Sequence, residues 1–165
     1  MALLRESHAR RPRGYNAQAM SQAEEAPPAR PPSKIPPLLQ AALVCDVAVT
    51  DPMTGKPSLI GIFDAIRVVQ FPTLRAMSVF FRLTDAEGYY PIRVDFIHAD
   101  TDTFVARLET EMEFADRTVS LGVHWAFPAL PIEQPGRYEF RIYASDMYLG
   151  CAGIEAKQRT RESEK

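Results

Sequence analysis

Alternation of apolar and polar residues with a period of two dominates the chain from Leu38 to about Lys157. In an extended chain this period places successive side chains on opposite faces, so it is typical of strands with one buried face. Clusters of Pro, Gly and Asp, as in residues 51–55 and 85–88, interrupt the alternation and favour turns. The pattern predicts an all-β domain, an antiparallel two-sheet sandwich of about seven or eight strands.

Individual strands follow from the same pattern. In the first, residues 39–50, Leu43, Cys45, Val47 and Val49 alternate and are expected to face the core. Residues 58–70 are expected to form one long strand with a bulge at Gly61 or Asp64. Trp125, on a later strand, is expected to anchor the core between the sheets. The clearest strand, residues 104–114, carries an acidic outer stripe made of Glu109, Glu111 and Glu113.

Composition divides the chain into three parts. Residues 1–37 hold seven of the 14 prolines and are expected to be a disordered, Arg-rich tail. Residues 38–157 form the predicted sandwich, and residues 158–165 form a charged C-terminal tail. The first part has six basic and three acidic residues, a net +3, and the rest has 13 and 18, a net −5. An acidic body argues against nucleic acid as the partner, because phosphate binding needs a concentrated positive face.

The sequence also bears on compartment and redox state. No apolar signal segment opens the chain, and no run approaches the roughly 20 apolar residues that span a membrane. We therefore expect a cytoplasmic protein with no membrane partner, whose translation starts at Met1 or at Met20. Cys45 and Cys151 are interpreted as buried structural thiols, and a disulfide between them stays open as an alternative.

Two separated stretches carry a family resemblance. The first comprises residues 43–46 and 58–64, and the second comprises Leu130-Pro131 and residues 135–140, which read Pro-Gly-Arg-Tyr-Glu-Phe. Their order and spacing resemble a family of small bacterial proteins of unknown function. The resemblance covers residues 38–157 and implies an immunoglobulin-like sandwich. It implies no activity, ligand or catalytic residue.

No motif points to an enzyme. A triad of Ser120, His124 and Asp146 fails, because Ser120 and His124 stand four residues apart on one strand, about 13 Å at roughly 3.3 Å per residue. No nucleophile elbow is present. His98, Asp100 and Asp102 could ligate a divalent cation, but Asp is equally typical of a hairpin turn. We therefore predict no enzymatic activity, no metal and no cofactor.

Two kinds of binding remain. Four apolar or aromatic residues fall on nominally outward positions and are the candidate contacts for a protein partner, which could be a second copy of the chain: Phe80, Ile97, Tyr143 and Tyr148. The leading hypothesis is an interaction or accessory module. The alternative is a small-ligand or carbohydrate-binding domain that uses residues at the loop end of the sandwich: Tyr89, Tyr90, His98, Asp100 and Asp102.

Overall fold

The computed structural model describes residues 35–159, so the predictions for residues 1–34 and 160–165 lie outside it. Within this range the chain forms nine strands and no helix, and hence no helix that could span a membrane. The strands are β1 (Leu38–Thr50), β2 (Pro57–Ile62), β3 (Ala65–Val68), β4 (Thr73–Thr84), β5 (Gly88–His98), β6 (Thr103–Phe114), β7 (Leu121–Ile132), β8 (Gly136–Ala144) and β9 (Met147–Gln158). The all-β prediction is confirmed.

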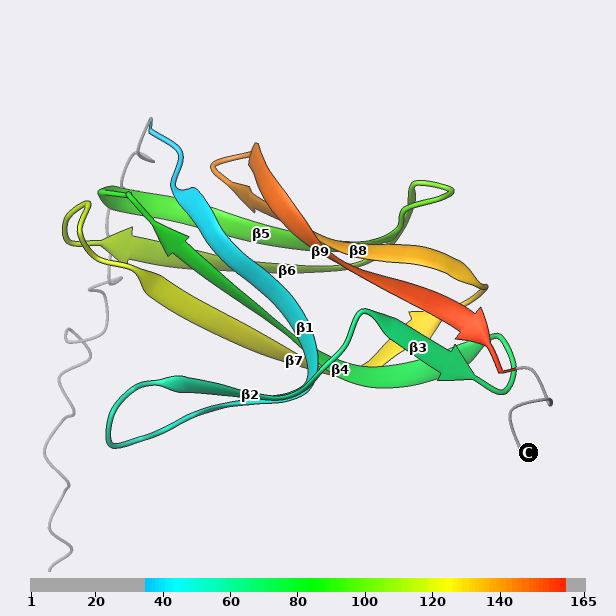
Figure 1. Ribbon diagram of the computed structural model, residues 1–165. Coiled ribbons are helices and arrows are strands. Elements are labelled where there is room, and N and C mark those ends of the chain that lie inside the picture. The colour runs from blue at the N-terminus through cyan, green and yellow to red at the C-terminus, as the bar shows by residue number, and fades with distance from the viewer. Residues whose placement is uncertain (1–34, 160–165) are drawn as a thin grey trace, which may run out of the picture.

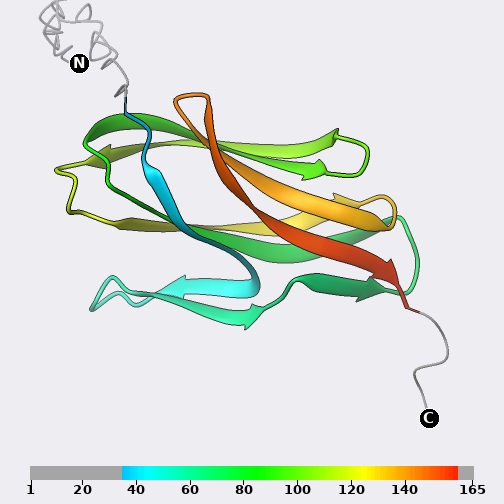
Figure 2. The ribbon, with the colours of Figure 1, turned by 45° about the horizontal axis from the view of Figure 1, so that its top comes forward.

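The strands form two packed sheets (Figure 1). Sheet A has the order β2-β1-β4-β7, and sheet B has the order β3-β9-β8-β5-β6. Figure 2 shows β5, β6, β8 and β9 as the upper layer and β4 and β7 below them. Large side chains fill the space between the layers. Phe96 packs against Phe140 with ring centroids 4.5 Å apart. Trp125, which is partly buried, packs against the core with its ring centroid 5.4 Å from that of the buried Phe81 on the same sheet.

The expected single strand over residues 58–70 is wrong. The chain leaves sheet A after Ile62 and enters sheet B at Ala65, where the carbonyl of Asp64 accepts a hydrogen bond of 2.8 Å from the Glu155 amide. β3 then pairs with β9 in parallel, so the sandwich is not wholly antiparallel. Strand β9 runs to Gln158, one residue past the predicted boundary of the domain.

The orientation predicted for β1 is also wrong. Val44 is buried opposite Val79 in the core, whereas Leu43 lies opposite Phe80 on the outer face of sheet A. Val47 and Val49, each 46% exposed, therefore face outward rather than inward. Alternation could not decide between the faces, because both faces of this strand are apolar.

The hairpin formed by β1 and β2 reaches across the outer face of sheet A. Its β1 arm ends at Thr50, whose hydroxyl shares a hydrogen bond of 2.9 Å with Nε2 of His124 on β7, although β1 and β7 are not paired. In Figure 2 the hairpin lies beneath the sheet. Phe80, on the outer face of β4, is only 7% exposed, and Gly122 on β7 leaves room for its ring. The hairpin thus adds a partial third layer.

The two cysteines are both free. Cys45 pairs with Ser78 on the outer face of sheet A, and Cys151 pairs with Arg141 on the outer face of sheet B. Sheets in a sandwich pack about 10 Å apart, beyond the separation of about 7 Å that a disulfide can bridge. The disulfide alternative is therefore wrong.

Candidate functional site

The four predicted partner contacts do not form one surface. Phe80 and Ile97 are only 7% and 5% exposed, so the prediction that they face solvent is wrong. Phe80 lies under the hairpin on sheet A. Ile97 lies on sheet B between Phe104 and Glu139, at an irregularity in the pairing of β5 with β6. Only Tyr143 and Tyr148 lie together, with ring centroids 5.5 Å apart.

The outer face of sheet B is covered by paired charges, which we call the arginine–carboxylate lattice. Asp95, whose side chain is 10% exposed, receives the guanidinium groups of Arg107 and Arg93 at 2.6 and 3.3 Å. Glu139 is likewise held between two arginines on β8. Most of these charges already have partners, so this face offers little free charge to another molecule. Members of the lattice are Arg93, Asp95, Asp102, Arg107, Arg137, Glu139, Arg141 and Asp146.

One side chain beside the lattice has a shifted acidity. A hydrogen bond to the Cys151 sulfur, with a smaller contribution from burial, raises the pKa of Tyr148 from 10.0 to about 12. Because the folded protein holds this proton more tightly than the unfolded chain, the interaction stabilises the fold below pH 10 and this stabilisation is lost as pH rises toward 12. We expect Cys151→Ala to lower the Tyr148 pKa toward its ordinary value.

Ultraviolet titration of tyrosinate measures this shift. The transition that disappears in Tyr148→Phe belongs to Tyr148, and in the wild-type protein it should stand well above that of an exposed tyrosine. An unchanged Tyr148 transition in Cys151→Ala would show that the sulfur does not hold the proton.

The predicted loop-end residues are divided between opposite ends of β5. Tyr89 and Tyr90 lie near its start and His98 at its end, so eight residues at about 3.3 Å each separate them. Tyr90 is fully buried, and its hydroxyl donates to the Ile35 carbonyl at 2.7 Å. A single ligand site built from all five residues is therefore wrong.

His98 and Asp100 belong to a structural corner at the start of β8. His98 is 4% exposed, and its Nε2 donates to the Pro135 carbonyl at 3.3 Å. The Asp100 carboxylate accepts a 3.0 Å hydrogen bond from the Arg137 amide. Asp102 instead pairs with Arg141 in the lattice, at 2.8 Å. These contacts fix the turn and leave little of the imidazole for a ligand.

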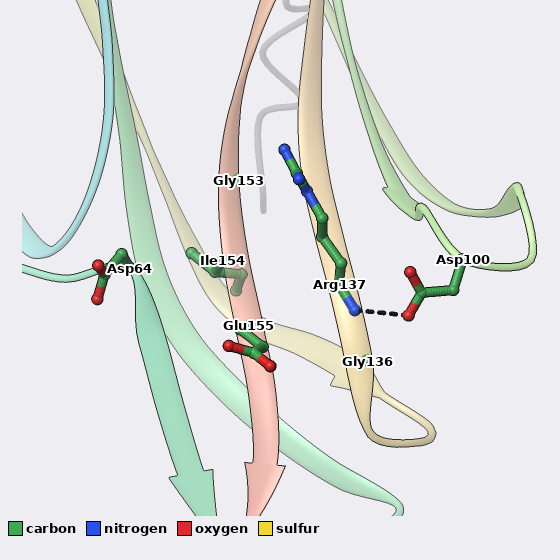
Figure 3. A pocket seen from close by; sticks show the side chains of 7 residues that line it. All are labelled: Asp64, Asp100, Gly136, Arg137, Gly153, Ile154 and Glu155. Carbon is green, nitrogen blue, oxygen red and sulfur yellow. Dashed lines mark hydrogen bonds between the residues drawn. The ribbon is translucent and has the colours of Figure 1, made fainter.

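A shallow depression of about 480 Å³ adjoins this corner (Figure 3). Asp64, from the link between the two sheets, and Glu155 on β9 line one side of it, and Arg137 and Asp100 line the other. Of the five predicted ligand contacts, only Asp100 lines it. Within the described part of the chain, no three His, Cys, Asp or Glu side chains are placed to hold a metal ion.

Among the described residues, several exposed apolar side chains gather on the β1–β2 hairpin. Val47 pairs directly with Ile60. Val49, two residues after Val47, and Ile62, two residues after Ile60, lie on the same face, on opposite sides of that pair. Val47 and Val49 are each 46% exposed, Ile60 is 58% exposed and Ile62 is 57% exposed. We call these four residues the hairpin face.

Sequence reasoning missed the hairpin face. The signal was present, because every residue of 42–49 except Asp46 is apolar, whichever face of the strand it lies on, whereas a strand at the surface of a two-layer sandwich needs only one apolar face. Excess apolar residues of this kind indicate a second contact. Alternation alone predicts that the apolar residues of this strand face the core.

Comparisons with known proteins give a family without an activity. No curated protein matches the chain. The solved structure of Pseudomonas fluorescens alkylpurine DNA glycosylase AlkC, bound to DNA containing an abasic site analog, covers 57% of this chain and 27% of that chain, at 14% identity and a TM-score of 0.39. So low a score carries no argument. The model of DUF6941, a family of unknown function, matches residues 40–154, and the chain belongs to this family.

Proposed function

We propose that this protein is a non-enzymatic interaction module whose partner is another polypeptide chain, bound at the hairpin face. The observation that carries the proposal is the exposure of Val47, Val49, Ile60 and Ile62 side by side on one two-stranded ribbon. Contiguous apolar surface on a folded domain is characteristic of protein contacts, because its removal from water stabilises a complex.

Two further features favour the hairpin face over the outer face of sheet B as the binding surface. The arginine–carboxylate lattice pairs its charges internally, and exposed pairs of this kind add little to binding. The hairpin face, in contrast, lies beside a free sheet edge, since within residues 35–159 β2 pairs only with β1. An apolar face next to a free edge allows side-chain packing and backbone pairing with one partner at the same time.

A small polar ligand is the alternative, and the depression lined by Asp64, Arg137 and Glu155 would be its site. The group of one guanidinium and several carboxylates favours a ligand rich in hydroxyl or amino groups. None of the described residues that line the depression is aromatic, so they provide no stacking platform of the kind that sugar rings favour. The apolar hairpin face is the stronger candidate.

We also propose that the sandwich is of the immunoglobulin-like class and that the protein works in the bacterial cytoplasm. The Tyr138 hydroxyl donates to the Gln134 carbonyl at 2.9 Å, an arrangement like the tyrosine corner of such sandwiches. The parallel β3 and the folded-over hairpin are departures from that class. The two free thiols support a reducing compartment.

Substitution of the hairpin face tests the proposed function. Val47→Ser and Val49→Ser together replace two side chains of the face without touching the free edge of β2. We expect a captured partner to be retained at least about tenfold less well, the loss that corresponds to about 1.4 kcal/mol. The measurement is quantitative affinity capture from the source cells, followed by a binding titration with the partner recovered.

Leu74→Ser is the matched control, since Leu74 is 67% exposed but lies at the start of β4, away from the hairpin face. It should retain the partner as the wild-type chain does. Equal retention by all three proteins would overturn the hairpin face as the binding surface.

A further inference from the structure

The two sheets end in four edge strands, and β2 differs from the other three. An edge strand exposes unpaired backbone groups, so proteins usually protect it with charge, proline or shortness. β6 carries Arg107 and three glutamates, β7 contains Pro128 and Pro131, and β3 has only four residues, one of them Arg67. β2 has six residues, Pro-Ser-Leu-Ile-Gly-Ile, with no charge and a proline only at its first position.

Charges of opposite sign flank this uncharged strand symmetrically. Lys56 lies four residues before Ile60 and Asp64 lies four residues after it. Both are exposed, and neither side chain has an ion-pair partner within residues 35–159. Most other acidic groups near the sheets are paired, as Asp46 is with Arg75. The two unpaired charges thus bracket the unprotected edge.

We propose that β2 pairs antiparallel with β2 of a second copy of this chain, in a register centred on Ile60. In that register the ladder covers the residues of β2 alone, and Lys56, one residue before it, comes to the same end of the ladder as Asp64 of the other copy, two residues after it. Their side chains can then form two ion pairs around the two-fold axis. The proposal rests on the proposed function, because it names a second copy as the chain that occupies the free edge beside the hairpin face.

The surroundings of the edge fit this pairing. Ile60 of each copy meets its equivalent directly across the ladder, so Val47 and Ile60 of both copies form one apolar row across the joined sheets. A hollow of about 360 Å³ lies beyond the end of β2, between β1 and β9, and is lined by Ala42, Leu43, Val44, Ile62, Phe63, Asp64, Ala152 and Gly153.

Sedimentation from micromolar to millimolar concentration tests the pairing. The wild-type chain should reach twice the monomer mass. Lys56→Glu and Asp64→Lys should each weaken association at least about tenfold, because each places like charges opposite one another. The double variant should restore association, which a merely local effect on folding would not do.

Two single lysine substitutions complete the set. Ile60→Lys places two positive charges at the axis and should leave a folded monomer, since Ile60 is 58% exposed. Met53→Lys, at the 89% exposed hairpin tip, adds the same charge outside β2 and should remain dimeric. Circular dichroism and thermal unfolding verify that each variant is folded.

A wild-type chain that stays monomeric at millimolar concentration would overturn the pairing, as would failure of the double variant to recover. Neither result tests the proposed function. That function is tested by how well the variant that carries both Val47→Ser and Val49→Ser retains a partner. Association that Ile60→Lys leaves intact would likewise exclude the free edge of β2 as the contact.

Discussion

Gly136→Ala is expected to destabilise the protein by about 2–5 kcal/mol, which is a large part of the stability of a small domain. Gly136 has φ +137°, a conformation that is essentially restricted to glycine. A Cβ atom there would also lie 2.5 Å from Oδ2 of Asp100 and 2.6 Å from Nε2 of His98. Both neighbours are fixed by hydrogen bonds, so they cannot move away without breaking the corner.

Gly55→Ala separates the two causes. Gly55 also has a positive φ, +68°, but nothing lies within 4 Å of the position its Cβ would take. We expect a loss of about 1 kcal/mol there, from backbone conformation alone. Urea unfolding of both variants gives the comparison. Equal losses would mean that the crowding by His98 and Asp100 is absent in solution.

Phe81→Ala should lower the free energy of unfolding by about 3–5 kcal/mol. Phe81 is fully buried on β4, which lies between β1 and β7, and its ring packs edge-on against Trp125. Removal of the ring leaves a cavity that strands paired on both sides cannot collapse to fill. The change in Trp125 fluorescence on denaturant unfolding measures the loss directly.

Phe104→Ala is the corresponding control on the surface. Phe104 is 55% exposed on the edge strand β6, where the Arg107 guanidinium lies 5.4 Å from its ring centre. We expect a loss below about 1 kcal/mol. Equal destabilisation of the two phenylalanine variants would contradict the burial of Phe81 between the two sheets.

The sequence was informative where a local pattern is enough to decide the structure. Alternation located nearly every strand, and the turn residues 51–55 and 85–88 lie where the structure turns. It failed at residues 58–70, because a strand that changes sheets keeps the same alternation on both sides of the change. Only the long-range pairing of β3 with β9 reveals that break.

The candidate contacts could be predicted less well, for a related reason. Whether Phe80 is exposed depends on a hairpin that ends 18 residues earlier in the chain, and no local pattern indicates that this hairpin covers it. Tyr90 and His98 were grouped because both are close to turns, although an extended strand separates those turns. Whether a side chain in a two-layer fold is buried depends on the elements that pack against it, which its position in the sequence does not reveal.

The place of β9 in sheet B has a consequence for synthesis of the protein. Sheet A needs only β1, β2, β4 and β7, so its strands have all left the ribosome once Ile132 has emerged. Among residues 35–159, β9 follows every other strand along the chain, yet it stands between β3 and β8, so β3 has no strand neighbour until β9 has emerged. A nascent chain can therefore complete sheet A early, whereas sheet B stays incomplete until Gln158 has emerged.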